Sequence, residues 1–415
     1  MKHENTIVNE YTLRSKDTPL VDFLLQAYEE NFQGAVKKNY EIVIQKVYEE
    51  NRPLLPMNLQ DNLTAQKLKK WVEKRKAPKN RQFVDKIVAA IEDSDNPMKY
   101  VDTTHALSLN DAYWITNKLT NHKWKDFNLY HNNFDEILAY VAFTGYRQKV
   151  SGVITTPELT SGGALKKCWS NREDGIYLIK GDDFVPKSDK RSQITNEFYA
   201  AQVADVMGLD FISYDLEEFQ HKNGEKELVC KCKLFTTEDV GFIDAYTYLK
   251  HCGITEPEDM LTTFIGQMQV AELCGKQLYA DMMLFDSIIG NRDRHTGNFG
   301  MLVNNNTGDV IKLAPIFDNG ISMLYGAAMM DLLPQNISEY KKGLGCKYLS
   351  FDEQSQLFVE KRHLPLLKKL CKFCFIRHAK YNISEPTLKL MEEFVRERAA
   401  RAIELYNEKQ KKLLK

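Results

Sequence analysis

A polar loop that interrupts an apolar run is the part of the sequence best suited to chemistry. The stretch "IIGNRDRHTGNFGML", residues 288–302, places the acid Asp293 five positions before the amide Asn298. A second acid, Asp318, follows the apolar run in "IKLAPIFDNG". Phosphoryl transfer from ATP needs oxygen ligands for Mg²⁺ and a base near the accepting hydroxyl group. The spacing therefore predicts that Asp293 is the base and that Asn298 and Asp318 bind Mg²⁺.

Residues upstream of this loop lie in the chain order that ATP binding by a two-lobed kinase requires. Lys180 ends the strand predicted for "GIYLIK", where its ammonium group can reach phosphate oxygens. Glu197 follows 17 residues later, near the start of a predicted helix, and can pair with Lys180. Leu234 and Phe235 end a further predicted strand in "CKLFTT", and they are the candidates for contact with adenine.

The glycine-rich stretch "TSGGAL", from Thr160 to Leu165, is the candidate phosphate loop. Successive backbone N–H groups in such a loop can bind an anion. The residues predicted to contact the phosphates are Ser161, Gly162, Gly163 and Ala164.

These signals differ in specificity. Three of them are common in proteins and therefore weak: a Gly-Gly turn, a solvated lysine in a strand, and an acidic residue at a helix start. The helix dipole favours the last of these. Asp293 and Asn298, followed by a second acid twenty residues later, form the specific signal. The role of His295 stays open. It either contacts a phosphate or orients that second acid or the loop backbone. Arg294 and Asp286 are interpreted as structural residues.

At these positions the sequence resembles the kinase core of HipA-like proteins, the toxin kinases of bacterial toxin–antitoxin systems. The family motif Asn-x-Asp-x-His-x-x-Asn matches "NRDRHTGN", which begins at Asn291, and the family's metal-binding Asp matches that of "APIFDNG". "TSGGALKKCW" is similar to the family's phosphate loop. The phrases "KDTPLVDF", "RKAPKNR" and "LSLNDAYWI" resemble a Firmicutes-type branch with its own N-terminal region.

The resemblance implies an α+β fold of the protein-kinase type, with a small β-rich N-lobe and a larger helical C-lobe. It implies ATP and Mg²⁺ as cofactors and a Ser/Thr protein substrate, for which translation factors and aminoacyl-tRNA synthetases are candidates. An antitoxin is a candidate partner. Because the phosphate loop of the better known HipA can carry a phosphoserine, autophosphorylation at Thr160 or Ser161 is a hypothesis.

The periodicity of apolar residues suggests three regions. Residues 1–147 are expected to be mainly helical after a short strand pair, with helices over residues 20–32 and 39–50, and to have a regulatory or partner-binding role. Residues 148–240 are expected to form the N-lobe, a small sheet with one helix. Residues 241–415 are expected to form the helical C-lobe, in which Thr255 and Glu258 of "TEPEDML" would form a capping box.

Composition narrows the class of protein. The chain has 56 basic and 57 acidic residues, which argues against direct binding of nucleic acid by the whole surface. The basic stretch "KLKKWVEKRKAPKNR" is interpreted as a solvated helix face. We expect no secretory signal and no membrane-spanning segment. The eight scattered cysteines favour reduced thiols and therefore a cytoplasmic protein.

Two other classes of protein remain open. "DRHTGN" also resembles the Asp-Arg-His-x-x-Asn loop of phosphoinositide kinases, so a lipid kinase is one alternative. The near-neutral charge and the lack of an evident basic membrane-binding helix disfavour it. A nucleotide-binding pseudokinase or interaction module is the other, although every residue needed for the chemistry is present.

Overall fold

The structure is a computed structural model that describes residues 6–32, 35–91, 98–182, 192–325 and 349–413. The described chain forms two compact units, which we call unit 1 and unit 2. Unit 1 comprises Met1–Leu178, Thr236–Phe242 and Val303–Val310. Unit 2 comprises Ile179–Phe235, Ile243–Leu302 and Ile311–Lys415. The functional boundaries expected after residues 147 and 240 stay predictions.

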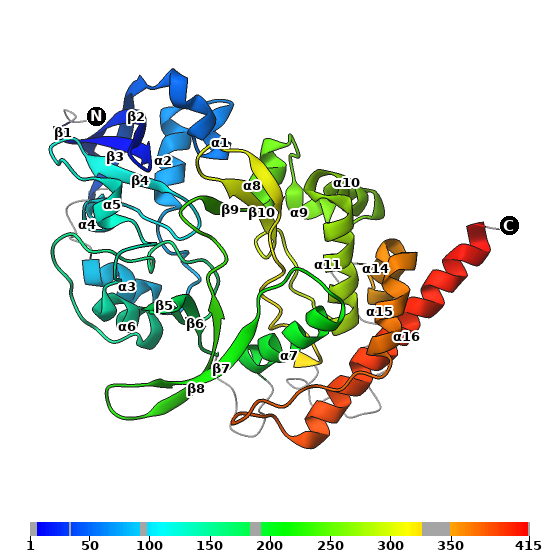
Figure 1. The fold of residues 1–415 in the computed structure, drawn as a ribbon. Helices are drawn as coiled ribbons and strands as arrows, with labels where there is room; N and C mark the ends of the chain where they lie inside the picture. The colour runs from blue at the N-terminus through cyan, green and yellow to red at the C-terminus, as the bar shows by residue number, and fades with distance from the viewer. Residues whose placement is uncertain (1–5, 33–34, 92–97, 183–191, 326–348, 414–415) are drawn as a thin grey trace. The chain divides into compact units, whose positions relative to one another are not determined.

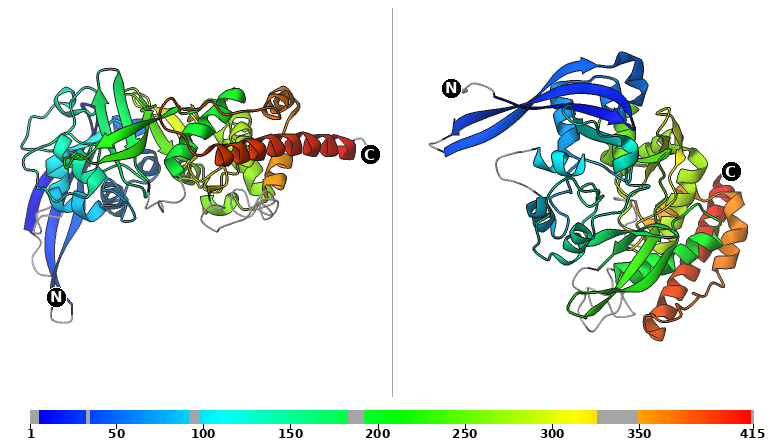
Figure 2. Two further views of the ribbon diagram at one scale, coloured as in Figure 1. Left: turned by 90° about the horizontal axis from the view of Figure 1, so that it is seen from below. Right: turned by 60° about the vertical axis from the view of Figure 1, so that its left-hand side comes forward.

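Unit 1 contains a four-stranded sheet with the strand order β3-β2-β1-β4. The sheet is antiparallel: β1 pairs with β2 from Thr6↔Ala27 to Ser15↔Thr18, and β1 also pairs with β4. Figure 2 shows β1, β2 and β3 as a long twisted ribbon. The strands of this sheet are β1 (Thr6–Ser15), β2 (Thr18–Phe32), β3 (Ala35–Val47) and β4 (Tyr113–Asn117).

The sheet shows that the expected helices over residues 20–32 and 39–50 were wrong. Val21, Phe23 and Leu25 alternate along β2 and are buried, as one face of a strand requires. Leu20 and Asp22 are buried as well, so the strand has buried residues on both of its faces. Such a strand reads as a nearly continuous apolar run, which periodicity does not distinguish from a buried helix.

The remaining elements of the N-terminal region are mostly short helices. α2 is capped by the Thr64 hydroxyl group. α6 is capped by the Asp135 carboxylate and is followed by Gly145, which has a positive φ. The helices are η1 (Glu49–Leu54), α1 (Met57–Gln60), α2 (Ala65–Glu73), α3 (Val84–Ile91), α4 (Lys99–Thr104), α5 (Trp124–Phe127) and α6 (Glu136–Thr144). The region is therefore mixed rather than mainly helical.

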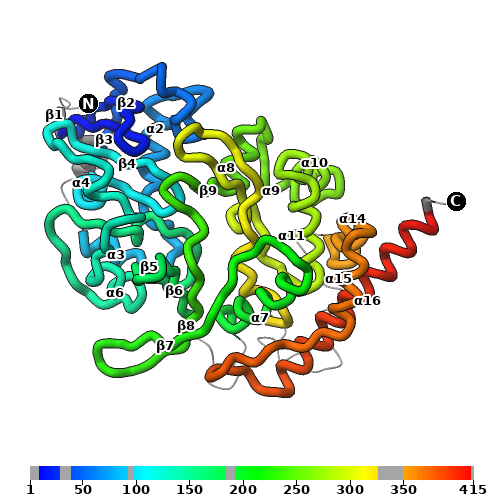
Figure 3. Tube along the Cα trace, viewed as in Figure 1, coloured from blue at the N-terminus to red at the C-terminus, as the bar shows by residue number. Residues whose placement is uncertain are grey.

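Strand β5 (Lys167–Arg172) is followed by β6 (Gly175–Lys180), which carries the predicted lysine at its end. In unit 2, α7 (Gln193–Val206) begins with a capping box formed by Ser192 and Thr195. The stretch "HKNGEK" contains the turn of a hairpin in which β7 (Tyr214–Gln220) runs antiparallel to β8 (Lys226–Lys233). Figure 3 shows these two strands running side by side to their turn.

The remaining elements of the described chain are three short strands and a set of helices. The strands have the order β11-β10-β9 in one sheet. They are β9 (Val240–Asp244), β10 (Gly300–Asn304) and β11 (Val310–Leu313). The helices are α8 (Ala245–His251), α9 (Pro257–Met260), α10 (Phe264–Cys274), α11 (Lys276–Ile289), α14 (Phe351–Phe358), η3 (Lys361–His363), α15 (Leu364–Leu370) and α16 (Glu385–Leu413).

The expected α+β class is confirmed, but the capping box at Thr255 is wrong. The residue that caps α9 is Glu256, whose side chain makes no capping hydrogen bond. The Glu258 carboxylate instead accepts hydrogen bonds from Thr296, 38 residues away. Its side chain is therefore directed away from the backbone N–H groups at the start of α9. No helix in the described part of the chain is long and apolar enough to cross a membrane.

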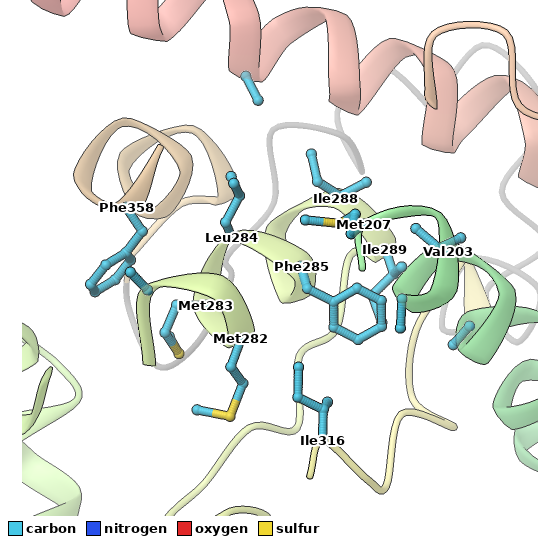
Figure 4. Packing of buried hydrophobic residues seen from close by; sticks show 14 of the residues in the cluster. Val203, Met207, Met282, Met283, Leu284, Phe285, Ile288, Ile289, Ile316 and Phe358 are labelled. Atoms are coloured by element: carbon cyan, nitrogen blue, oxygen red, sulfur yellow. The ribbon is translucent and has the colours of Figure 1, made fainter. Parts of the chain in front are cut away.

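Helix α11 lies at the centre of the unit 2 core. Figure 1 shows α14 and α16 beside it. In Figure 4, the labelled side chains of α11 lie between Val203 of α7 on one side and Phe358 of α14 on the other. Because Phe285, Ile288 and Ile289 have no exposed surface, the end of α11 is fixed in position. The polar loop that follows therefore starts from a rigid point.

Helix α11 ends at Gly290, which allows the chain to turn into the polar loop. Gly290 has φ of 67°, a conformation that glycine adopts without strain. A Cβ atom at this position would lie 2.8 Å from Cζ of Phe394. Gly208, which follows α7, has φ of 65°, but a Cβ atom there would meet nothing within 4 Å. The two glycines differ in packing but not in backbone conformation.

We predict that Gly290→Ala destabilises the protein more than Gly208→Ala does. Gly208→Ala should cost only the backbone strain, about 1–2 kcal/mol. Gly290→Ala should cost about 1–3 kcal/mol more, because Phe394 has to move in a packed core. Urea unfolding of the two variants measures both free energies. Equal losses would show that the contact with Phe394 carries no cost.

Candidate active site

The structure brings together three predicted site residues in unit 2: Lys180, Glu197 and Asp318. Nζ of Lys180 lies 3.0 Å from Oε1 of Glu197 and 2.7 Å from Oδ1 of Asp318. Lys180 ends β6 and Glu197 lies in the first half of α7, so the pair expected from sequence is formed. The side chains of Lys180 and Glu197 are 8% and 3% exposed, whereas that of Asp318 is 39% exposed and thus open to a ligand.

The charges of this group hold the lysine in its protonated form. Burial opposes the positive charge of Lys180, but Asp318 and Glu197 outweigh it and raise the pKa of the lysine well above its usual value. The Tyr214 ring adds to this, because Nζ of Lys180 lies 5.4 Å from its centroid. Two carboxylates thus share one ammonium group, and negative charge is in excess.

Two backbone N–H groups hold the Glu197 carboxylate and the Asp318 backbone in place. The Asn319 N–H group donates to Oε2 of Glu197 at 2.8 Å, and the Asp318 N–H group donates to the Tyr214 hydroxyl oxygen at 3.2 Å. Asp318 has φ of 58°, in the left-handed region that few residues other than glycine adopt. Strained backbone of this kind is concentrated at functional sites. Here it aims the Asp318 carboxylate at Lys180.

A buried ion pair connects the polar loop, residues 290–298, to the segment around Asp318. The guanidinium group of Arg294 donates to both carboxylate oxygens of Asp286, at 2.8 and 2.9 Å, and both side chains are fully buried. Its remaining donors contact the carbonyl oxygens of Asn298 and Phe317 and Oδ1 of Asn319, each at 2.7 Å. Arg294 and Asp286 therefore have the structural role expected from sequence.

Asp293 and Asn298 lie in contact within the polar loop. Nδ2 of Asn298 donates to the carbonyl oxygen of Asp293 at 2.8 Å and to its Oδ2 at 3.3 Å. Nδ2 of Asn291 donates to Oδ1 of Asp286, while Oδ1 of Asn291 accepts from the Asp293 N–H group at 3.0 Å. Since the Asn298 amide uses its NH₂ group on Asp293, its oxygen is the atom suited to a metal ion.

The surroundings of Asp293 make it a stronger base than an ordinary aspartate. Burial raises the pKa of the Asp293 carboxyl group, and the negative charge of Asp318 raises it further. His295 and Arg294 oppose this rise. A general base works best when its pKa lies closer to the operating pH. The direction of the shift therefore suits the role predicted for Asp293.

His295 acts on the loop backbone in this structure. Its Nδ1 atom accepts a hydrogen bond from the Gly297 N–H group at 3.0 Å. This contact agrees with one of the two open interpretations, in which the histidine orients the loop. Contact between His295 and a phosphate stays a prediction.

Glu258 is a residue of the site that the sequence reasoning missed. Its Oε1 atom accepts a hydrogen bond from the Thr296 N–H group at 2.9 Å and a second one from the Thr296 hydroxyl group. The carboxylate therefore holds the tip of the polar loop from helix α9. The sequence signal was only an acid at a helix start, which suggested capping.

Leu234 and Phe235 directly follow β8 and are partly buried. The ring of Phe235 stacks on that of Phe317, with centroids 5.7 Å apart and an angle of 24° between the planes. Phe317 precedes the metal-site candidate Asp318 in the chain, so the stacking places the predicted adenine-contact segment beside the Asp318 segment. Contact of either residue with adenine stays a prediction.

The predicted phosphate loop belongs to unit 1, and its side chains are held internally. The Ser161 hydroxyl group donates to the carbonyl oxygen of Pro157 at 2.9 Å and accepts from Nε1 of Trp169 at 2.6 Å. Nζ of Lys167 donates to the carbonyl oxygen of Gly162 at 2.6 Å. Sequence reasoning missed Lys167, although "ALKK" follows the glycines directly.

The glycines of this loop are exposed, and Gly163 has φ of 82°. A pocket of about 80 Å³ lies beside the loop. Ligand pockets are usually about 300–1,000 Å³, so this pocket does not by itself enclose a nucleotide. Its lining includes residues 108–110, Thr160, Ser161, Gly162, Lys167 and Trp169.

The residues of unit 2 fit a magnesium ion. Glu197 and Asp318 share one cation, Lys180, and Asp293 adds a third carboxyl group whose pKa the charge of Asp318 raises. In the described ranges, no group of three or more His, Cys, Asp and Glu side chains could hold a metal ion alone. Mg²⁺ is usually bound by one or two carboxylates together with phosphate oxygens and water. Asp318 and the Asn298 oxygen suit that arrangement.

Comparison with known proteins identifies the family of this chain. The HipA-like C-terminal domain matches residues 141–372, more than half of the 415 residues. The chain therefore belongs to the HipA-like C-terminal domain family, as its motifs predicted. The match includes the phosphate loop, the lysine strand, the polar loop and the Asp318 segment.

One relative is the serine/threonine-protein kinase CtkA of Helicobacter pylori. It is 31% identical over 167 residues, which cover 37% of this chain and 48% of that protein. The chain thus spans about half the length of this relative. The crystal structure of a proinflammatory kinase CtkA from Helicobacter pylori aligns with a TM-score of 0.44 and 16% identity, over 61% of this chain and 94% of that one.

We predict that Arg294→Met destabilises the protein strongly, because it leaves the Asp286 carboxylate buried without its cation. Breaking a buried ion pair in this way costs about 3–5 kcal/mol. The double variant Asp286→Leu/Arg294→Met removes both charges and should lose less stability than the single variant. Chemical denaturation of the three proteins measures this. A double variant that is less stable than the single one would contradict the prediction.

Proposed function

We propose that this protein is an ATP- and Mg²⁺-dependent Ser/Thr protein kinase of the HipA type. The observation that carries the proposal is the network in unit 2 that joins Lys180, Glu197 and Asp318 and, through Arg294, the Asp293 loop. Family membership supports a protein-kinase-like fold. The relative described as a serine/threonine-protein kinase supports the reaction class.

In this proposal each residue has a separate task. Lys180, kept charged by its carboxylate partners, binds phosphate oxygens, and Glu197 holds the lysine in place. Asn298 and Asp318 would bind Mg²⁺, which neutralises phosphate charge and orients the phosphates when it is bound. Asp293 accepts the proton of the attacking hydroxyl group, for which its raised pKa is suited.

The remaining predicted residues bind the nucleotide. Backbone N–H groups of the phosphate loop, around Ser161, Gly162, Gly163 and Ala164, contact the phosphates. Leu234 and Phe235 contact adenine, and His295 supports the polar loop.

By resemblance to the family, we further propose a protein substrate of the translation apparatus, an antitoxin partner and a cytoplasmic location. The free thiols of all seven cysteines in the described ranges fit a reducing compartment. A phosphoinositide-type lipid kinase is the second candidate, because "DRHTGN" fits both classes of kinase. Only the phosphorylated product separates the two.

We predict that Asp293→Asn abolishes phosphoryl transfer while ATP binding survives. The loss should be about 10²–10⁴-fold, the usual contribution of a general base. Asn298 and Asp318 remain to bind metal, so the affinity for ATP should change little. The assay combines labelled ATP with a lysate of the host, and calorimetry measures ATP binding. Asp205→Asn, an exposed position on α7, is the matched control.

The outcomes of this assay separate the classes of protein. A labelled protein band that Asp293→Asn removes supports the protein kinase. Label in the lipid fraction supports the lipid kinase, and ATP binding without any transfer supports the pseudokinase. Loss of ATP binding together with turnover in Asp293→Asn would contradict the separate roles of base and metal ligand.

We also propose slow autophosphorylation of the phosphate loop at Ser161. This hydroxyl group is buried and hydrogen-bonded to Trp169 and Pro157, so these contacts have to break before it can accept phosphate. We predict that Trp169→Phe, which removes the indole donor, accelerates incorporation. Peptide mass spectrometry after incubation with ATP measures the rate. No phosphate on residues 155–165 in either protein would contradict the proposal.

A further inference from the structure

Two residues of the N-terminal region, Arg81 and Gln82, contact the phosphate loop directly. They lie in "KAPKNRQF", between α2 and α3, and belong to unit 1 like the loop itself. From sequence, this segment was interpreted as part of a solvated basic face. Arg81 is instead only 2% exposed, which is rare for an arginine unless its charge is paired.

The guanidinium group of Arg81 holds both ends of the loop. Its Nη2 atom donates to Oε2 of Glu158 at 2.8 Å and to the carbonyl oxygen of Lys167 at 3.0 Å. Its Nη1 atom donates to the carbonyl oxygen of Glu158 and lies 3.5 Å from that of Ser161. One side chain thus fixes the backbone on both sides of the glycines.

Gln82 binds the backbone directly after the glycines. Its backbone N–H group donates to the carbonyl oxygen of Ala164 at 2.8 Å, and its Oε1 atom accepts from the Lys166 N–H group at 3.1 Å. Lys167 adds the contact with the carbonyl oxygen of Gly162. The carbonyl groups of Ser161, Gly162 and Ala164 are therefore all directed toward protein donors.

The direction of these carbonyl groups sets the direction of the neighbouring N–H groups. In a trans peptide unit the C=O of one residue and the N–H of the next point in opposite directions, and the described chain has no cis peptide bond. The N–H groups of Gly162, Gly163 and Leu165 thus point away from Arg81, Lys167 and Gln82. Among the described residues these three N–H groups have no acceptor. They are the groups that an anion would bind.

Glu158 extends the contact from Arg81 to the loop side chains. Its Oε1 atom accepts from the Trp169 N–H group at 2.7 Å, and the Trp169 indole group donates to the Ser161 hydroxyl oxygen. The side chains of Arg81 and Glu158 are 0% and 1% exposed. A buried ion pair contributes little net stability after desolvation, so its value here is the geometry that it imposes on the loop.

We propose that Arg81 is a positioning residue for ATP binding, which acts by holding the backbone N–H groups of the phosphate loop in their anion-binding direction. The inference rests on the proposed function, because it assumes that this loop binds the phosphates of ATP. It assigns to the N-terminal region a direct role in nucleotide affinity. Arg81 itself does not touch the nucleotide.

The test compares ATP with adenosine as ligands of the full-length protein. Arg81→Lys keeps a positive charge beside Glu158 but lacks the planar group that serves four acceptors. We expect its affinity for ATP to fall about tenfold or more, which corresponds to about 1.4 kcal/mol. Its affinity for adenosine, which has no phosphate, should stay unchanged. Calorimetry of both ligands gives the ratio, and thermal unfolding reports whether the variant is folded.

Two further proteins keep the test decisive. If Arg81→Lys does not fold, Arg81→Met/Glu158→Leu removes both buried charges and leaves no unpaired one, and the same selective loss of ATP affinity is expected. Asp22→Asn is the matched control, because it removes the charge of a buried side chain of the sheet in unit 1, which pairs with the exposed Lys118. It should lower stability without changing the ratio of the two affinities.

The possible results separate the two proposals. Equal loss of ATP and adenosine affinity in the Arg81 variants, or no loss at all, would overturn the positioning role while the proposed function stands. A wild-type protein that binds adenosine and ATP equally well would show that the loop does not bind phosphates and would overturn the positioning role. A wild-type protein that binds neither ligand would overturn the proposed function and, with it, this inference.

Discussion

The rest of the site depends on the buried ion pair between Asp286 and Arg294. One guanidinium group connects the last turn of α11, the polar loop and the segment around Asp318. All three parts are anchored to the core of unit 2 at one point, because α11 is buried along its final turn. A single side chain, whose donors all bind protein acceptors, thereby sets the mutual position of the proposed base Asp293 and the proposed metal ligand Asp318.

The sequence identified the residues that can be recognised by their spacing or order along the chain. Asp293 and Asn298 are five positions apart, and a short loop brings them into contact wherever it is placed. Lys180 and Glu197 were predicted from their order along the chain and do pair. Glu258 and Arg81 were missed, because their partners lie 38 and 77 residues away. Nothing within a short window of sequence distinguishes such residues from solvated charges.

The fold was predictable where an element carries its own start and stop signals. Gly208 follows the end of helix α7, and β7 and β8 flank a turn that contains Asn223 and Gly224. The failure over residues 20–32 has a physical cause. A strand that is buried on both faces shows no alternation of polar and apolar residues, so its length of apolar sequence suggested a helix. Its partners in the sheet are the strands directly before and after it in the chain, β1 and β3.

The contact between Arg81 and the phosphate loop bears on how this chain can evolve. A module that is joined to its neighbour only by a linker can be lost or exchanged by recombination. The region before residue 148 supplies Arg81 and Gln82, which together satisfy carbonyl groups on both sides of the glycines. Exchange of that region for an unrelated one would leave those carbonyl groups without their donors. The N-terminal region and the loop therefore have to be inherited together, and substitutions in either are constrained by the other.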